Sequence, residues 1–300
     1  MFIIKNKFIF LTISAVIVLS SILSVIVFGL KYSIDFKGGT ELEVNYTTSQ
    51  PDIKLVNAIL EKDSIADAVV QQVGTSGLSI KSRPLSETER ITLVSDLSIG
   101  GVYPLTQTNF TSIGPSVGRE LASKAVVAII VVVIAIVLYI AFAFRTVSKP
   151  VSSWKYGLIA IATLVHDIAI PSGVFALLGH FYGAEVDTLF VVALLTVLGI
   201  SVSDTIVVFD RIRENLRNHT APTFADTVGK SLNQTFVRSI NTSLTVILVL
   251  ISLFFFGPLA TKNFALVLIV GMFFGTYSSI FVASPLLVIA ENLQHKKGKK

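Results

Sequence analysis

Six long apolar runs dominate the pattern of hydrophobic and polar positions along the chain. Each approaches or exceeds the roughly 20 residues that an α-helix needs to cross the hydrocarbon core of a membrane. The pattern therefore predicts an α-helical membrane protein with six transmembrane helices. The six runs are Phe8–Leu30, Lys124–Phe144, Gly157–Gly179, Thr188–Phe209, Phe236–Gly257 and Phe264–Ile289.

The first run raises the question of a cleaved leader, because Lys5 and Lys7 precede it as in a secretory signal peptide. The apolar stretch Phe8–Leu30 is longer than the roughly 7–15 residues of a signal-peptide core. No A-x-A cleavage site follows it. We therefore expect this segment to remain in the membrane as the first transmembrane helix.

A long polar connection, Lys31–Ser123, separates the first run from the second. Its apolar positions recur alternately with strand and helix periods, and Ser86 with Glu89 matches the capping-box pattern of a helix start. The order strand, helix, strand, strand, helix, strand predicts one ferredoxin-like α+β domain between helices 1 and 2. The expected elements are strand Thr40–Tyr46, helix Pro51–Lys62, strands Asp67–Gly74 and Leu78–Leu85, helix Ser86–Ser98 and strand Asn109–Gly118.

The apolar runs and the polar connection together predict the organisation of the whole chain. The amino-terminus and the first transmembrane helix occupy residues 1–30, and the α+β domain occupies 31–123. Transmembrane helices 2–6 occupy 124–290, and a basic tail occupies 291–300.

Lysine and arginine are distributed unevenly over the connections. The short connections His180–Asp187 and Pro258–Asn263 contain only Lys262, whereas thirteen basic residues flank the spans at the opposite ends. By the positive-inside rule both termini are cytoplasmic, and the α+β domain is external. The thirteen are Lys5, Lys7, Arg145, Lys149, Lys155, Arg211, Arg213, Arg217, Lys230, Lys296, Lys297, Lys299 and Lys300.

Composition supports this assignment. The chain is 52% hydrophobic and 14% charged, with a mean hydropathy of +0.77, whereas soluble domains contain about 25% charged residues. The net charge of +5 reflects membrane topology, so we do not expect a nucleic-acid partner. Because the chain has no cysteine, disulfides and thiolate metal sites are excluded, and we expect no metal or cofactor.

Polar residues inside the spans are the candidate functional groups. They form a stripe on each of the third, fourth and fifth spans, at spacings that place each stripe on one helix face. Facing lipid would leave such groups unpaired, so we expect the stripes to face one another or water. The residues are Thr163, His166 and Asp167, then Ser201 and Asp204, then Arg238, Asn241, Thr242 and Thr245.

Asp204 lies within the apolar run Thr188–Phe209, where burial of a carboxylate costs about 2.5–3.5 kcal/mol even on lenient scales. Arg238 follows at a similar depth at the start of the fifth span, so we expect an Asp204–Arg238 ion pair. Protonation of Asp204 would release Arg238 and change the packing of two helices. A purely structural ion pair is the alternative, and a hydrogen-bonded helix contact is the alternative for His166–Asp167.

Four sequence stretches resemble the SecD/SecF family of protein-export membrane proteins. DFKGGT, Asp35–Thr40, resembles the family's DFxGG hallmark, and GPSVGREL and HDIAIPSGVFALLG also fit. The most specific match is VLGISVSDTIVVFDRIREN, Val197–Asn215, together with TFVRSINTSLT, Thr235–Thr245. The stretches fit the SecF branch better than the SecD branch. One departure is Ser203, where the family often has asparagine.

The resemblance implies a subunit that pairs with SecD, assists the SecYEG channel in late export of preproteins, and uses the proton-motive force. It places the chain among the resistance-nodulation-division-like transporters of the bacterial cytoplasmic membrane, with YajC and YidC as further candidate partners. By motif position Asp204 and Arg238 correspond to the family's proton-pathway residues. His166, Asp167, Ser201, Asn241 and Thr242 are candidate relay groups.

Three alternatives remain open at this point. One is half of a small-molecule or lipid exporter of the resistance-nodulation-division type, although DFKGGT favours protein export. A second is an intramembrane enzyme, but the chain contains no HExxH, GxSxG, GxGD pair or GxxxxGK[ST] motif, so we expect no catalytic site. A third is a scaffold, for which Asp204 would be dispensable.

Overall fold

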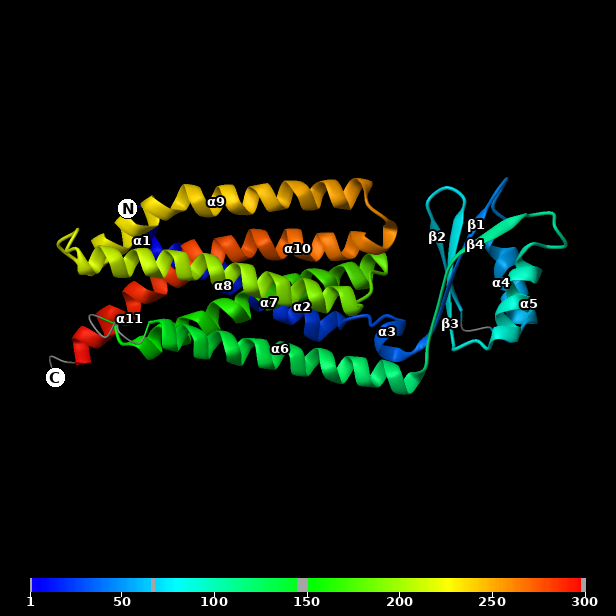
Figure 1. The fold of residues 1–300 in the computed structure, drawn as a ribbon, viewed down its shortest axis with the longest axis horizontal. Coiled ribbons are helices and arrows are strands. Elements are labelled where there is room, and N and C mark those ends of the chain that lie inside the picture. The colour runs from blue at the N-terminus through cyan, green and yellow to red at the C-terminus, as the bar shows by residue number, and fades with distance from the viewer. Residues whose placement is uncertain (1, 66–67, 145–150, 298–300) are drawn as a thin grey trace. The chain divides into compact units, whose positions relative to one another are not determined.

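The computed structural model describes residues 2–65, 68–144 and 151–297 of the chain. Within these ranges six helices are long and apolar enough to span a membrane, and a four-stranded α+β insertion lies between the first two of them (Figure 1). The fold class predicted from the sequence is thereby confirmed. Arg145, Lys149, Lys299, Lys300 and Asp67, which entered the expectations above, lie outside the described residues.

The described chain separates into two compact units. One comprises residues 1–31 and 127–300, and the other comprises residues 32–126. The helices of the first unit are α1 (Phe2–Lys5), α2 (Lys7–Phe28), α6 (Pro115–Ala143, which begins in the other unit), α7 (Ser153–Tyr182), α8 (Thr188–Arg217), α9 (Phe224–Phe256), α10 (Leu259–Ser278), a π-helical turn η1 (Ser279–Ala283) and α11 (Ser284–Lys297).

Several spanning helices are longer than their apolar runs. Helix α8 starts where Asp187 accepts a hydrogen bond from the Phe190 amide at 2.7 Å, and it continues past Phe209 to Arg217. Helix α9 starts at Phe224, where the Thr223 hydroxyl accepts from the Asp226 amide at 3.1 Å. These caps satisfy amides at the helix starts, so each helix end is set by a polar residue rather than by the edge of the apolar run.

In the helical unit, α7, α8 and the sixth span, Ala260–Gln294, are the most deeply buried. Helix α6 has few buried positions. Helix α2 crosses α7 closely at Gly173, where an added Cβ would lie 2.5 Å from the Cα of Ser21. The Ser24 hydroxyl also donates to the Gly173 carbonyl at 3.0 Å. Figure 1 shows α1, α11 and the α8–α9 connection at one end of the bundle.

The second unit is an antiparallel sheet with strand order β2-β3-β1-β4. The predicted strand and helix order is confirmed, although the last strand starts four residues earlier than expected and ends before Pro115. Two helices pack with the sheet around Leu42, Ile80 and Leu93. The elements are α3 (Ile34–Lys37), β1 (Gly39–Tyr46), α4 (Ile53–Lys62), β2 (Val69–Val73), β3 (Gly77–Ser82), α5 (Glu87–Leu97) and β4 (Leu105–Ile113).

Two of the stretches that suggested the family meet within this unit. Gly38 and Gly39 of DFKGGT have φ angles of 80° and 142°, and a Cβ on Gly38 would lie 2.8 Å from the Cα of Pro115. A Cβ on Gly118 would lie 2.8 Å from the Gly38 amide nitrogen. Glycine is required here because the start of β1 and the start of α6 touch through their backbones.

Candidate functional site

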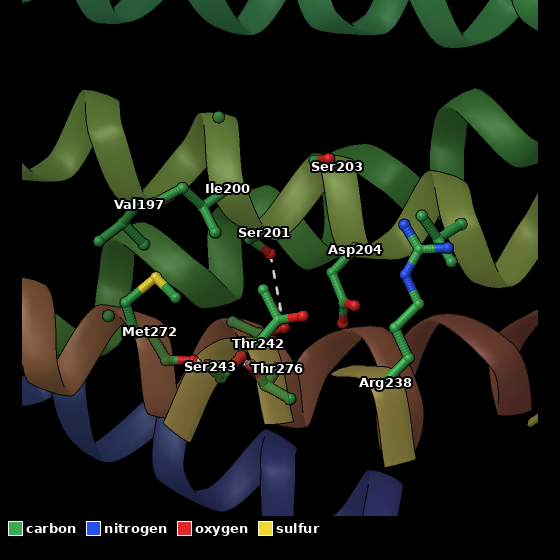
Figure 2. A pocket seen from close by; sticks show the side chains of 14 residues that line it. Val197, Ile200, Ser201, Ser203, Asp204, Arg238, Thr242, Ser243, Met272 and Thr276 are labelled. Carbon is green, nitrogen blue, oxygen red and sulfur yellow. Dashed lines mark hydrogen bonds between the residues drawn. The ribbon is translucent and has the colours of Figure 1, made fainter. Parts of the chain in front are cut away.

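A cavity of about 240 Å³ lies where α8, α9 and α10 meet (Figure 2). It is lined on α8 by Ser201 and Asp204, on α9 by Arg238 and Thr242, and on α10 by Gly275. Figure 2 shows Asp204 extending from α8 and Arg238 from α9. The structure thus brings four of the nine candidate residues from the sequence to the lining of one cavity.

Asp204 is half-buried and has one strong partner. Its Oδ1 accepts a hydrogen bond from the Ser239 hydroxyl on α9 at 2.5 Å. Among the described residues, no group hydrogen-bonds to its buried Oδ2. A buried acidic oxygen without a partner is costly when ionised, and binding of a proton relieves that cost.

Arg238 does not contact Asp204 as the sequence suggested. Among the described residues no ion pair within 4.0 Å joins the two side chains, although both line the cavity. Successive residues of an α-helix point about 100° apart. Ser239 therefore faces α8 and is buried, while Arg238 lies at the edge of the contact and is exposed.

The polar stripe of α9 that the sequence analysis singled out is not the face that packs within the chain. The selected residues Arg238, Asn241, Thr242 and Thr245 are all exposed. The buried stripe repeats every four residues, at Ser231, Thr235, Ser239 and Ser243. This spacing is present in the sequence, but serine and threonine are common in transmembrane helices and carry no charge that marks them as functional. Ser239 is the residue of this stripe that reaches Asp204.

His166 and Asp167 form a second polar cluster, on the buried face of α7. Asp167 is 0% and His166 3% exposed, and His166 Nδ1 lies 2.9 Å from Asp167 Oδ1. Asp167 Oδ2 accepts from Ser201 at 2.5 Å and from Ser278 at 3.1 Å. Ser201 therefore belongs both to this cluster and to the wall of the Asp204 cavity.

The remaining candidate residues differ in whether they line the cavity. Thr242 lines the cavity, whereas Asn241 is exposed and is not among the lining residues. Thr163 is buried, but its hydroxyl donates to the Ala160 carbonyl of its own helix at 2.8 Å. Two serines of the sixth span that the sequence did not single out, Ser278 and Ser279, lie among these groups.

Glycines allow α10 to approach α8 closely at the cavity. A Cβ on Gly275 would lie 3.0 Å from the Cβ of Ser201, and a Cβ on Gly271 would collide with the Val197 side chain. By contrast, an added Cβ on Gly199 of α8 meets no described atom within 4 Å. Close helix approach at a GxxxG pair is typical of membrane helices.

The chemistry of this region is that of proton binding and hydrogen bonding. Its groups are carboxyl, guanidinium, imidazole and hydroxyl side chains. Within the described ranges no group of three or more His, Cys, Asp or Glu residues is arranged to hold a metal ion. Both acids, Asp167 and Asp204, are hydrogen-bonded by serine hydroxyls, and a carboxyl group within a membrane span can bind and release a proton.

Comparison with known families assigns the chain to one of them. A model described as "Protein export membrane protein SecD/SecF, C-terminal" matches residues 100–293, and one described as "SecD/SecF GG Motif" matches residues 23–50. The protein translocase subunit SecF of Thermobaculum terrenum is 41% identical over 97% of this chain and 94% of its own length. The chain belongs to the SecD/SecF family. It is a transport protein of the SecF type.

Solved structures and fused relatives agree with this assignment. The crystal structure of SecDF from Thermus thermophilus superposes with a TM-score of 0.82 at 34% identity, over 96% of this chain and 38% of that one. Protein translocase subunit SecDF of Bacillus subtilis is 34% identical over 98% of this chain and 38% of its own length. The SecF-type fold therefore also occurs within longer SecDF chains, of which it covers 38%.

Proposed function

We propose that this SecF-type chain works with a SecD-type partner beside the SecYEG channel, where proton flow through its spans drives late movement of a preprotein across the membrane. The protein would act as an auxiliary translocase subunit without a catalytic site of its own. YajC and YidC are further candidate members of the assembly. The observation that carries the proposal is the cavity containing Asp204, whose Oδ2 has no hydrogen-bond partner among the described residues.

Asp204 is proposed as the proton-binding group and Arg238 as the cation that responds to its charge. Both side chains border one cavity, so a change of charge on Asp204 changes the electrostatic potential at Arg238. Ser201 and Thr242 are proposed as hydroxyls of the proton path. One proton crossing 100 mV supplies about 2.3 kcal/mol, which is comparable with the free-energy difference between two helix packings.

A SecD-type partner is supported by the fused relatives and by the surface of α8 and α9. The relatives from Thermus thermophilus and Bacillus subtilis are single chains, each named SecDF. In the spans of the present chain, Ser203, Arg238, Asn241 and Thr242 are exposed. Such groups are costly against lipid, so we propose that the partner's helices cover this face.

The proposed orientation places both termini in the cytoplasm of a bacterial cell and the α+β unit outside. The proposed domain organisation keeps residues 1–30, 31–123, 124–290 and 291–300 as separate parts. Support comes from the basic residues near α1 and α11 and at the α8–α9 connection, which share one end of the bundle (Figure 1). Cytoplasmic connections are rich in Lys and Arg.

The test is preprotein release from membrane vesicles containing the chain, a SecD-type partner and the channel, with and without a proton gradient. Asp204→Asn is expected to abolish the stimulation by the gradient while leaving co-purification with the partner unchanged. Asp210→Asn, at the exposed cytoplasmic end of α8, removes the same charge outside the cavity and serves as the control. Normal gradient stimulation in Asp204→Asn would reject proton coupling at this residue.

A further inference from the structure

The His166–Asp167 pair is deeply buried within the described spans and does not line the Asp204 cavity. Three donors from three helices surround the Asp167 carboxyl: His166 on α7, Ser201 on α8 and Ser278 on α10. We propose that this pair is a second proton-binding site, separate from Asp204 and connected to the Asp204 cavity through the Ser201 hydroxyl.

The ring of His166 indicates which member of the pair takes up a proton. Its Nε2 is buried and has no hydrogen-bond partner among the described residues. An imidazolium would leave a buried N–H unpaired, whereas a neutral ring with its proton on Nδ1 leaves only a lone pair there. The geometry therefore favours a neutral His166 that donates through Nδ1 to Asp167, so a proton that the pair takes up is held by the Asp167 carboxyl.

No cation faces this pair from the packed elements that the structure describes. The aromatic ring stacked on His166 belongs to Tyr277 of α10, with centroids 6.1 Å apart, and its hydroxyl donates to the Phe10 carbonyl at 3.2 Å. Across Ser201 lie Asp204 and Arg238, both in the cavity. A carboxylate held by hydrogen bonds alone inside the spans is a group that proton uptake would neutralise.

Both protonation states of Asp167 can keep their hydrogen bonds. Ser278 and Ser201 each have a second acceptor, the Gly275 carbonyl, at 2.9 Å and 3.5 Å from their hydroxyl oxygens. When Asp167 takes up one proton, its new O–H donates to Ser201 Oγ, and Ser201 turns its own hydrogen to Gly275. The charge changes from −1 to 0 without a helix displacement, because only hydroxyl hydrogens move.

Ser201 connects the pair to the cavity, because it contacts Asp167 and also lines the cavity. Its hydroxyl lies 2.5 Å from Asp167 and also lines the cavity that contains Asp204 (Figure 2). A proton that enters the cavity therefore has one hydroxyl to pass before it reaches Asp167. The role of this second site in transport rests on the proposed function, but the existence of the site does not.

Infrared difference spectra of the full-length chain in lipid nanodiscs, recorded across pH in H₂O and D₂O, test the site. The Asp204→Asn variant is expected to retain one slowly exchanging carboxylic-acid band, which comes from Asp167. The double variant with both Asp204→Asn and Asp167→Asn is expected to lack this band. Absence of any such band in Asp204→Asn would overturn the proposal. Export by Asp204→Asn is a separate measurement, so failure of coupling at Asp204 leaves this result readable.

Ser201→Ala keeps both acids and covers the case in which Asp167→Asn does not fold. Loss of a hydrogen bond to a charged group should move the pH midpoint of the Asp167 band by about one pH unit. Ser172→Ala is the matched control, because the Ser172 hydroxyl donates to the Ile168 carbonyl of its own helix at 2.8 Å. Equal midpoints in Ser201→Ala and Ser172→Ala would contradict the connection through Ser201.

Discussion

The Ser239 hydroxyl of α9 donates a 2.5 Å hydrogen bond to Oδ1 of Asp204 on α8. This contact, rather than an ion pair, is what joins the two helices at the level of the candidate proton site. It leaves Arg238 beside Asp204 in the cavity but free of a direct bond to it. The acid can therefore change its charge while one hydrogen bond keeps the helices together.

Arg238 is expected to act through its charge. Arg238→Ala should reduce gradient-stimulated preprotein release by about tenfold, which corresponds to roughly 1.4 kcal/mol. Arg238→Lys should retain most of the stimulation, because no bidentate contact with Asp204 depends on the guanidinium shape. Release from vesicles with and without a gradient measures both. A lysine variant as defective as the alanine variant would show that the guanidinium itself is required.

Ser239→Ala removes the donor to Asp204 while leaving both charged groups in place. A hydrogen bond to a charged group contributes about 1.5–3 kcal/mol, so we expect a lower unfolding temperature and weaker gradient stimulation. Ser252→Ala on the same helix is the control, because the Ser252 hydroxyl is exposed and donates to its own helix at Leu248. Indistinguishable results for the two variants would mean that the Ser239 bond is unimportant in the membrane.

Two glycines of the spans should respond oppositely to leucine. Gly271→Leu would drive α10 from α8 at Val197 and lower thermal stability by about 1–3 kcal/mol, as overpacking does. Gly199→Leu gains the same helix propensity but meets open space within the described chain, so its stability should not fall. If a partner covers this face, Gly199→Leu should instead weaken co-purification with the SecD-type subunit.

The capping box of α5 makes the stability of the α+β unit depend on pH. The Arg83 side chain, together with the Ser86 amide and hydroxyl, lowers the pKa of Glu89 to about 2 from the ordinary 4.5. Because the folded pKa is depressed, this stabilisation is complete above pH 4.5 and is lost as the pH falls towards 2.

Hydrogen exchange of the α5 amides in the full-length protein measures this effect. Glu89→Gln should exchange faster than the unmodified chain at pH 7, and the difference should shrink between pH 4.5 and pH 2. Glu61→Gln, an exposed position on α4, removes the same charge without touching the α5 start and is the control. A difference that stays constant across this range would contradict a role for the Glu89 charge.

Local patterns account for what the sequence predicted well. Runs of 20 or so apolar residues can only be satisfied by a membrane, so the six spans followed from composition along the chain. Alternating periods and the Ser86–Glu89 capping box placed the elements of the insertion, because these interactions join residues a few positions apart. The polar positions within the spans singled out Asp204 and Arg238, the family motifs agreed, and both residues border the cavity.

Only the tertiary structure decided which polar side chains touch. Asp204 and Arg238 were matched by depth and charge, but the rotation of α9 about its axis turns Ser239 towards Asp204 instead. The meeting of Asp167, Ser201 and Ser278 depends on the close approach of α7, α8 and α10, which Gly275 permits. Helix rotation and spacing result from packing over the whole length of each helix, so no local pattern in the sequence specifies them.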